Sequence, residues 1–165
     1  MIAYFTIFKS ENEKYSGGLL IVNEKGLPLS FKYTTPIQPG KIQKIIFGNN
    51  LKSYLASEII GKKLLSEEKE LSFIFVDDSE IIEFVETDKN LLFLKETYNQ
   101  SENHFKGTEG AIITSPNRGL KIQSSKEITS EIFEKIKNFS DYFDLYEPFS
   151  RLKEALSHIC SSEEN

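Results

Sequence analysis

The sequence predicts an α+β protein with two layers, in which helices cover one face of a largely antiparallel sheet of about five to seven strands. Short apolar segments separated by turn residues recur over residues 1–125, as in consecutive antiparallel strands. Residues 126–160 carry apolar side chains at helical spacing instead. The chain has 165 residues, of which 39% are hydrophobic. We therefore expect one domain over residues 1–165, with the sheet and a helix in 1–125 and C-terminal helices in 126–160.

The first strands are expected at residues 2–8 (IAYFTIF) and in a hairpin within residues 17–35. Leu19–Val22 is a continuous apolar run, as in a strand covered on both faces. Residues 23–26 form a turn in which Gly26 takes a positive φ. Hydrophobic and other side chains then alternate, as in a half-buried strand, with the hydrophobic set being Leu27, Leu29, Phe31 and Tyr33.

A helix is predicted from Lys41 to the charged run that starts at Ser66, after Pro39-Gly40 ends the preceding strand. Residues 48–50 (Gly-Asn-Asn) interrupt the pattern, so two short helices with a break near Gly48 are the alternative. The apolar positions at helical spacing are Ile42, Ile45, Ile46, Leu51, Leu55 and Ile59.

The second half of the sheet is expected at residues 71–76, 80–86, 91–97, 111–114 and 120–123. The pattern of residues 80–86 also fits a helix. Residues 115–119 (Ser-Pro-Asn-Arg-Gly) have the composition of a hairpin turn, which accounts for Arg118 at its tip.

Two helices are predicted at the C-terminal end of the chain. Ser124-x-x-Glu127 matches a capping box, and Pro148 suits the first turn of the second helix. The first apolar stripe is Ile132, Ile136, Phe139 and Phe143, and the second is Phe149, Leu152, Leu156 and Ile159.

Composition argues against several classes of protein. The net charge is −5, and the positive excess of residues 1–70 comes from dispersed lysines. Only two arginines are present, Arg118 and Arg151, whereas a nucleic-acid-binding protein normally has a concentrated basic face. One cysteine, Cys160, excludes an internal disulfide framework. Without a basic leader or a long apolar run, we expect a cytoplasmic protein that does not bind a membrane.

Once these elements are placed, the hairpin of residues 17–31 (GGLLIVNEKGLPLSF) resembles the central hairpin of roadblock and longin modules, which are profilin-like domains. The same string, followed by YTTPIQP, is also similar to runs in uncharacterised conserved hypothetical bacterial proteins. The roadblock-like resemblance implies dimerisation or docking onto a partner, often a small GTPase. This chain departs from that pattern in having more strands and a longer helical C-terminus.

Asp77-Asp78 is the strongest candidate for catalysis. Carboxylates that follow a buried strand commonly hold Mg²⁺ in phosphoryl-transfer sites, and Glu80, Glu83 and Glu86 follow closely. The alternative is a turn, because Asp and Ser bind neighbouring backbone amides where a strand ends. No Lys, Arg or His motif for a phosphate accompanies the pair, so we favour the turn.

Other reactive residues are isolated in the sequence. His104 lies in a polar loop, and His158 is two positions from Cys160, a spacing at which helical side chains point in different directions. Gly17-Gly18 precedes a strand rather than a helix, so we interpret it as a chain reversal rather than a phosphate loop.

The sequence therefore favours a protein–protein interaction module, an adaptor, scaffold or regulatory subunit that is not an enzyme and needs no cofactor or metal. The partner is expected to be another protein or a second copy, as in a homodimer. Aromatic residues are enriched at interfaces, so the contact residues are assigned to the C-terminal region as Tyr142, Tyr146, Phe149, Leu152, Leu156 and Ile159. The alternatives are a Mg²⁺-dependent phosphohydrolase or nuclease that uses Asp77 and Asp78, and a small-molecule sensor with a pocket between sheet and helices.

Overall fold

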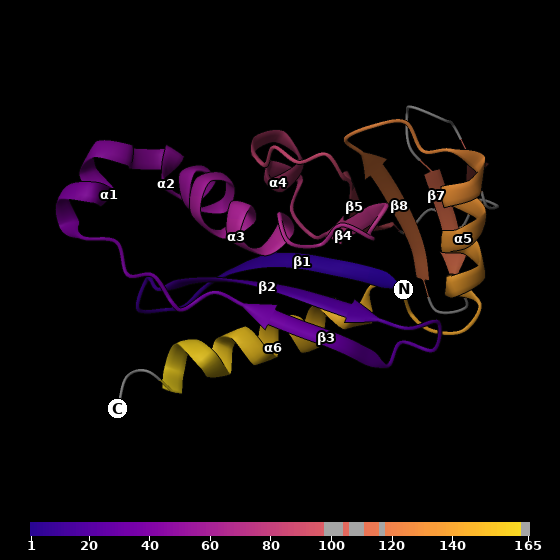
Figure 1. The fold of residues 1–165 in the computed structure, drawn as a ribbon, viewed down its shortest axis with the longest axis horizontal. Helices are drawn as coiled ribbons and strands as arrows, with labels where there is room; N and C mark the ends of the chain where they lie inside the picture. The colour runs from indigo at the N-terminus through magenta and orange to yellow at the C-terminus, as the bar shows by residue number, and fades with distance from the viewer. Residues whose placement is uncertain (98–103, 106–110, 116–117, 163–165) are drawn as a thin grey trace.

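The computed structural model has an α+β fold, as predicted, in which helices pack on a mixed sheet (Figure 1). It describes residues 1–97, 104–105, 111–115 and 118–162. The strands of these residues form one eight-stranded sheet in the order β3-β2-β1-β4-β5-β8-β7-β6. Their bounds are β1 Ile2–Lys9, β2 Tyr15–Val22, β3 Pro28–Tyr33, β4 Phe73–Val76, β5 Asn90–Thr97, β6 His104–Phe105, β7 Ala111–Ser115 and β8 Arg118–Ser124.

The sheet is largely antiparallel, as predicted, but its centre is parallel. β4 runs parallel to β1 on one side and to β5 on the other. The remaining neighbours of the described sheet pair antiparallel. Parallel neighbours need a crossover connection, and the segments from β3 to β4 and from β4 to β5 supply it with helices. The carboxyl ends of β1, β4 and β5 therefore lie at the same end of the sheet.

The predicted hairpin is formed by β2 and β3. Gly26 has a φ of 77° in the turn, which only glycine adopts without strain. The side chain of Asn23 accepts hydrogen bonds from the amides of Lys25 and Leu27. The prediction of a hairpin with a positive φ at Gly26 is confirmed.

The predicted helix after β3 is built from several short pieces, with the break at Gly48 that the sequence indicates. Gly48 has a φ of 52°, which ends the first helix. The pieces are α1 Lys41–Phe47, a 3₁₀ turn Gly48–Asn50, α2 Leu51–Tyr54, a π-helical stretch Leu55–Gly61 and α3 Lys62–Leu65.

Two of the predicted elements are wrong. Residues 80–86 do not form a strand, because Asp78 caps a short helix, α4 Ser79–Phe84, by accepting a hydrogen bond from the Glu80 amide. Ser124 does not start a helix, because β8 extends to it. Thr129 caps the next helix instead, α5 Ser130–Ser140.

The last helix, α6 Glu147–Ser162, has Pro148 in its first turn, as predicted. It lies against β1 and β2 on the face opposite α1–α4 (Figure 1). Among the helices of the described residues, none combines the length and the apolar character that crossing a membrane requires.

Helices cover both faces of the sheet, so the structure has three layers and the predicted two-layer arrangement is wrong. One core cluster joins Tyr4, Phe75 and Leu92 to α5 and α6. The other joins Phe5, Ile74 and Leu91 to the helices from α2 to α4. Adjacent strand residues point to opposite faces, so central strands that are apolar at every position require cover on both sides.

Gly17 and Gly18 lie within β2, so their interpretation as a chain reversal is wrong. A Cβ at position 17 would lie 2.0 Å from Cγ2 of Ile60 in the π-helical stretch, and a Cβ at position 18 would lie 2.7 Å from Cδ1 of Leu152 in α6. Each glycine therefore lets a helix approach one face of β2 closely.

Candidate functional site

Asp77 directly follows β4, at the carboxyl end of the parallel strands. Its side chain is only 4% exposed. The Thr6 hydroxyl from β1 donates a hydrogen bond to Oδ1 over 2.7 Å, and Nζ of Lys153 from α6 lies 2.7 Å from Oδ2. Both carboxylate oxygens are therefore bound by groups from other elements, and the contacts connect α6 to β1 and to the end of β4.

Asp78 binds groups of the helices on the other face of the sheet. Its Oδ1 accepts the amide of Glu80 over 2.9 Å at the start of α4. Its Oδ2 accepts a hydrogen bond from Nζ of Lys52 in α2 over 2.5 Å. Glu80 lies 3.8 Å from the same ammonium group. Asp78 thus joins α2, β4 and α4.

The two carboxylates diverge. Lys153 belongs to the α6 layer and Lys52 to the α2 layer, as expected for successive residues at the end of a strand. A metal ion held by both would need them to converge and would have to displace two ammonium groups. Within the described residues, no group of three or more His, Cys, Asp or Glu side chains is placed to hold a metal. This geometry favours the turn-and-cap interpretation.

These contacts determine the directions in which the pKa values of Asp78 and Lys153 shift. Burial raises the pKa of the Asp78 carboxyl, but the hydrogen bonds from Lys52 and the Glu80 amide outweigh it and lower the pKa below its ordinary value of 3.8. Burial lowers the pKa of Lys153, but the hydrogen bond to Asp77 and the attraction of the nearby carboxylates together outweigh burial and raise the pKa. The contacts therefore keep both groups charged near neutral pH.

Replacing Asp78 by Asn should make stability depend less on pH. Asn still caps α4, so the variant loses the charge and the oxygen that accepts from Lys52, at a cost of about 0.5–1 kcal/mol near neutral pH for this partly exposed pair. Because the folded pKa of Asp78 lies below 3.8, the contribution is full above that value and disappears as pH falls through the folded pKa. Urea unfolding of the wild type and of Asp78→Asn, measured from neutral pH down through the folded pKa of Asp78, should show that the difference between their free energies of unfolding disappears.

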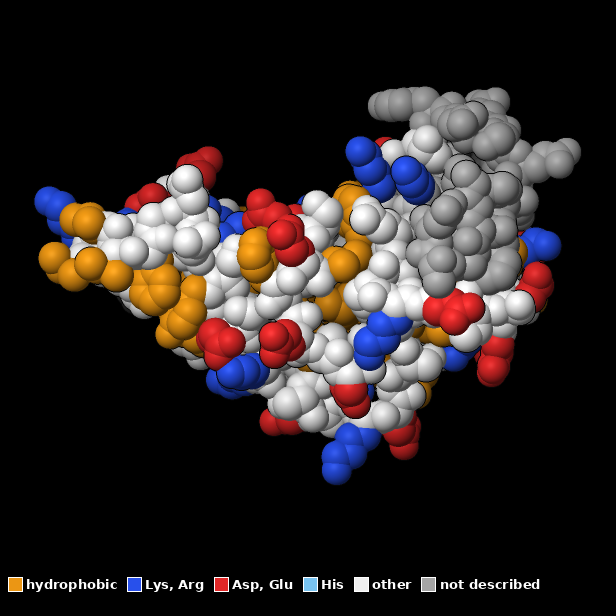
Figure 2. All heavy atoms as spheres, turned by 90° about the horizontal axis from the view of Figure 1, so that it is seen from above, with side chains coloured by type: hydrophobic (Ala, Val, Ile, Leu, Met, Phe, Trp, Pro, Cys, Tyr) orange, Lys and Arg blue, Asp and Glu red, His pale blue; other side chains and the backbone are white. Residues whose placement is uncertain are grey.

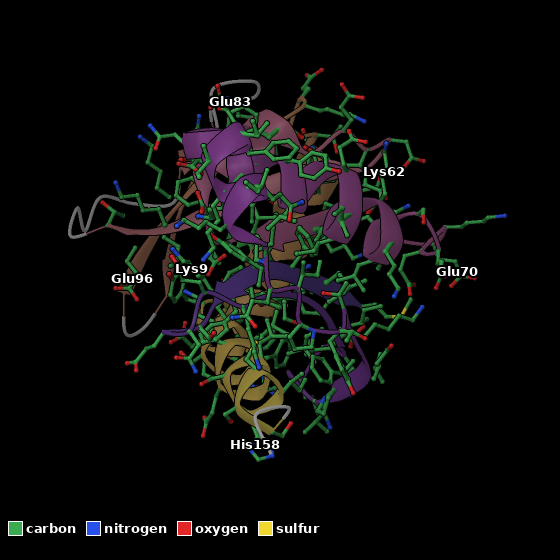
Figure 3. The ribbon with its side chains drawn as sticks, turned by 90° about the vertical axis from the view of Figure 1, so that its left-hand side faces the viewer. Lys9, Lys62, Glu70, Glu83, Glu96 and His158 are labelled. Atoms are coloured by element: carbon green, nitrogen blue, oxygen red, sulfur yellow. The ribbon has the colours of Figure 1, made fainter. Side chains whose placement is uncertain are left out.

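The matched control is Glu83→Gln. Glu83 is exposed on α4 and points away from the body of the protein (Figure 3), so this variant is expected to match the wild type throughout. A gap for Asp78→Asn that persists in acid would show that the carboxylate charge does not stabilise the fold.

The C-terminal residues assigned to partner contact are mostly interior, which corrects that assignment. Phe149 and Leu152 are each 1% exposed and Leu156 is fully buried. Tyr146 and Ile159 are half-buried against the same core. Tyr142 alone of the six is exposed, at 72%. The stripe faces β1 and β2, because Gly18 leaves space there for Leu152 and Leu156.

Exposed hydrophobic side chains lie instead on α1, a surface that the sequence interpretation missed. Ile42, Ile45 and Ile46 are 73%, 65% and 76% exposed, and we call these three residues the α1 tip. No residue of α1 is buried. Hydrophobic side chains gather at the end of the molecule that α1 forms (Figure 2). The sequence signal that could have identified this surface is the break at Gly48, which separates the three isoleucines from the buried stripe that starts at Leu51.

A second set of exposed hydrophobic residues lies on β3, the strand at one edge of the described sheet. Leu29, Phe31 and Tyr33 are at least two-fifths exposed. The rings of Phe31 and Tyr33 stack with their centroids 5.5 Å apart. The sequence predicts a half-buried strand here, whereas α6 covers the neighbouring strands and leaves β3 open.

The reactive residues of α6 differ in exposure. His158 is exposed and projects outward from α6 (Figure 3), whereas Cys160 is 1% exposed. His104 lies in β6, and the pairing of Ser115 with Arg118 confirms the second hairpin. The side chains of His104 and Arg118 lie outside the described residues. One surface hollow is lined by Met1, Glu24, Lys135, Asn138, Phe139, Asp141 and Tyr142.

No protein-family model and no curated protein matches this chain. Among solved structures, the chain is similar to Marinitoga piezophila Argonaute, crystallised in complex with a 5′ OH guide RNA. The identity is 17% and the TM-score 0.35, over 83% of this chain and 24% of that chain. The chain thus spans about a quarter of that structure, and the TM-score is too low to support an argument about function.

Proposed function

We propose that this protein is a protein–protein interaction module, an adaptor, scaffold or regulatory subunit, and that it docks through the α1 tip. The observation that carries the proposal is the exposure of three isoleucines on one short helix, at 65–76% each. Single exposed apolar residues are common on proteins, but a contiguous group marks an interaction surface.

The α1 tip is held in place without being covered. The ring of Phe47 at the end of α1 stacks on Tyr54 of α2, with centroids 4.4 Å apart. Lys44 forms an ion pair with Glu13 in the loop between β1 and β2. These contacts use the other faces of α1, so the isoleucines project into solvent. A partner meets an already folded helix and does not have to order it.

The free energy available at this surface is considerable. Burial of one isoleucine side chain contributes about 1.5–3 kcal/mol. Three adjacent side chains at Ile42, Ile45 and Ile46 fit the one-turn spacing of a helix that lies in an apolar groove. A groove of that kind on a partner protein is the surface that would cover the tip.

Charge favours a protein over a membrane as the occupant. The chain has a net charge of −5 and the lysines of residues 1–70 are dispersed, whereas binding to anionic lipid is typical of clustered basic residues. Of the two lysines on α1, Lys44 is already neutralised by Glu13. Phe47, the aromatic residue of α1, is half-buried against Tyr54 and does not extend into solvent. Lipid-anchoring helices instead combine a basic face with exposed aromatic residues.

The resemblance of the hairpin to roadblock and longin modules implies the same class of function and stays a prediction. The metal-dependent hydrolase gains no support from Asp77 and Asp78, whose oxygens bind Lys153 and Lys52. A screen for small molecules that bind the hollow beside α5 would test the alternative of a small-molecule sensor.

The test replaces Ile45 by Asp, which puts a charge at the centre of the α1 tip. Tagged wild-type and variant proteins are used for quantitative affinity purification from the native cell. We expect a protein recovered in stoichiometric amount with the wild type to fall at least tenfold with the variant, since a buried unpaired charge costs several kcal/mol.

The matched control is Tyr142→Asp, which adds the same charge at a side chain of similar exposure, 72%. This variant should retain the partner. Loss of the partner with Tyr142→Asp alone would move the contact to the C-terminal region. Binding of the wild type to neutral or anionic vesicles, lost in Ile45→Asp, would show that lipid covers the tip.

A further inference from the structure

Within the described residues, β3 is an edge strand, and one side of its backbone is not paired with a further strand. The Thr34 amide donates to the Gly17 carbonyl over 3.0 Å. Lys32, which lies two residues before Thr34, pairs with Leu19 of β2. Because hydrogen-bonding direction alternates along an antiparallel strand, Phe31 and Tyr33 turn their N–H and C=O groups to the open edge. This edge can therefore accept another strand by direct pairing.

The usual protection against strand pairing is weak on this edge. Natural edge strands carry charges, proline or bulges that block an added strand. In β3, Pro28 and a register irregularity opposite Ile21 and Val22 lie at the beginning of the strand. The charge of Lys32 is neutralised by Glu68, 2.6 Å away, and Glu67, 3.6 Å away. Among the residues that the structure describes, the segment from Phe31 to Tyr33 therefore has none of these protections on its open side.

The side chains beside this edge are aromatic and exposed. Phe31 pairs with Leu20 and Tyr33 with Gly18, so both rings lie on the face of the sheet that α6 covers further in. They are 40% and 50% exposed. A strand added at the edge would place its own side chains beside these rings.

We propose that β3 is a homodimer interface, in which β3 of one copy pairs antiparallel with β3 of a second copy across a two-fold axis at Lys32. Phe31 of each copy then faces Tyr33 of the other, and the outward N–H and C=O groups of these residues bind each other. Aromatic cross-strand pairs of this kind stabilise a sheet. The two sheets join into one.

Self-complementarity is the argument for a second copy over an unrelated peptide. A two-fold interface requires one patch to match itself, and the short aromatic segment does so. The only charge of β3, on Lys32, is bound within its own chain by Glu68, so the two copies do not repel strongly where the lysines face each other. The same neutrality gives an acidic or basic peptide no electrostatic advantage.

The interface is separate from the α1 tip, so this proposal does not depend on the proposed function. Contact along one short strand buries little area, as in weak or transient interfaces, and we expect a dissociation constant of about 1–100 µM. Sedimentation equilibrium of the full chain over that range measures it. We expect the wild type to change from monomer to dimer as concentration rises, and Phe31→Lys to raise the dissociation constant at least tenfold.

The matched control is Ile42→Lys, which introduces the same charge on α1 and should leave the dimer unchanged. Tyr33→Lys carries the test if Phe31→Lys fails to melt cooperatively. A wild type that stays monomeric at about 100 µM, or a dimer that tolerates the lysine at β3, would overturn the proposal. Dissociation by Ile42→Lys alone would place the two-fold contact on α1.

Discussion

Replacing Phe149 by Ala is expected to lower the free energy of unfolding by about 3–5 kcal/mol. The side chain is 1% exposed, and its ring meets those of Tyr4 in β1, at 5.1 Å between centroids, and Tyr146, at 5.4 Å. Removal leaves a cavity between α6 and the sheet that these neighbours cannot fill. Urea or guanidinium unfolding followed by circular dichroism measures the change.

Tyr142→Ala is the control for this experiment, because Tyr142 is exposed in the same aromatic-rich segment. Its expected effect is within about 0.5 kcal/mol. A small effect of Phe149→Ala on stability, together with loss of a partner, would restore the C-terminal stripe as a contact surface and contradict the packing described above.

Gly17→Ala is expected to destabilise the fold by about 1–3 kcal/mol through overpacking. The added Cβ would lie 2.0 Å from Cγ2 of Ile60. Ile60 is fully buried, and a β-branched residue in a helix has little rotamer freedom. The helix must therefore move away from β2. Thermal and chemical unfolding of the variant would measure the loss.

A second substitution shows whether the contact with Ile60 causes this loss. In the double variant Gly17→Ala/Ile60→Ala the clash is removed, so it should be more stable than the sum of the two single effects implies, by at least about 0.5 kcal/mol. Gly40→Ala, whose Cβ meets no atom within 4 Å, causes no clash and should cost only about 0.5–1 kcal/mol, because Ala is a poorer N-cap than Gly at the start of α1. Additive effects of the two substitutions would show that Gly17 does not set the approach of the helix.

Local signals in the sequence predicted many elements of the fold. Gly26 and Asn23 identified the hairpin turn, Gly48 the break between helices, and Pro148 the start of α6. Wrong assignments arose where two signals competed. Residues 80–86 fit strand and helix about equally, and the cap supplied by Asp78 decided for the helix.

The number of layers depends on contacts between distant segments, which local patterns do not contain. Apolar runs such as Leu19–Val22 indicated burial on both faces, yet one-sided cover was expected because the hairpins implied an antiparallel sheet. The parallel pairing of β1 with β4 follows from the crossover through α1–α3. That crossover places helices on the face opposite α6.

The candidate surface was the least predictable feature. The stripes of α1 and α6 have the same helical spacing, so periodicity cannot tell a covered stripe from an open one. Gly18 allows α6 to pack on β2, whereas α1 has no buried residue. The position of Asp77 and Asp78 at a strand end was predicted, but their pairing with Lys153 and Lys52 joins residues far apart in the chain.

Hydrogen–deuterium exchange of the full chain, alone and bound to the partner recovered by affinity purification, tests the docking surface most directly. Binding through Ile42, Ile45 and Ile46 should slow amide exchange in residues 41–50 and leave α6 as slow as in the free protein. Protection confined to residues 139–162, with α1 unchanged, would contradict docking through the α1 tip.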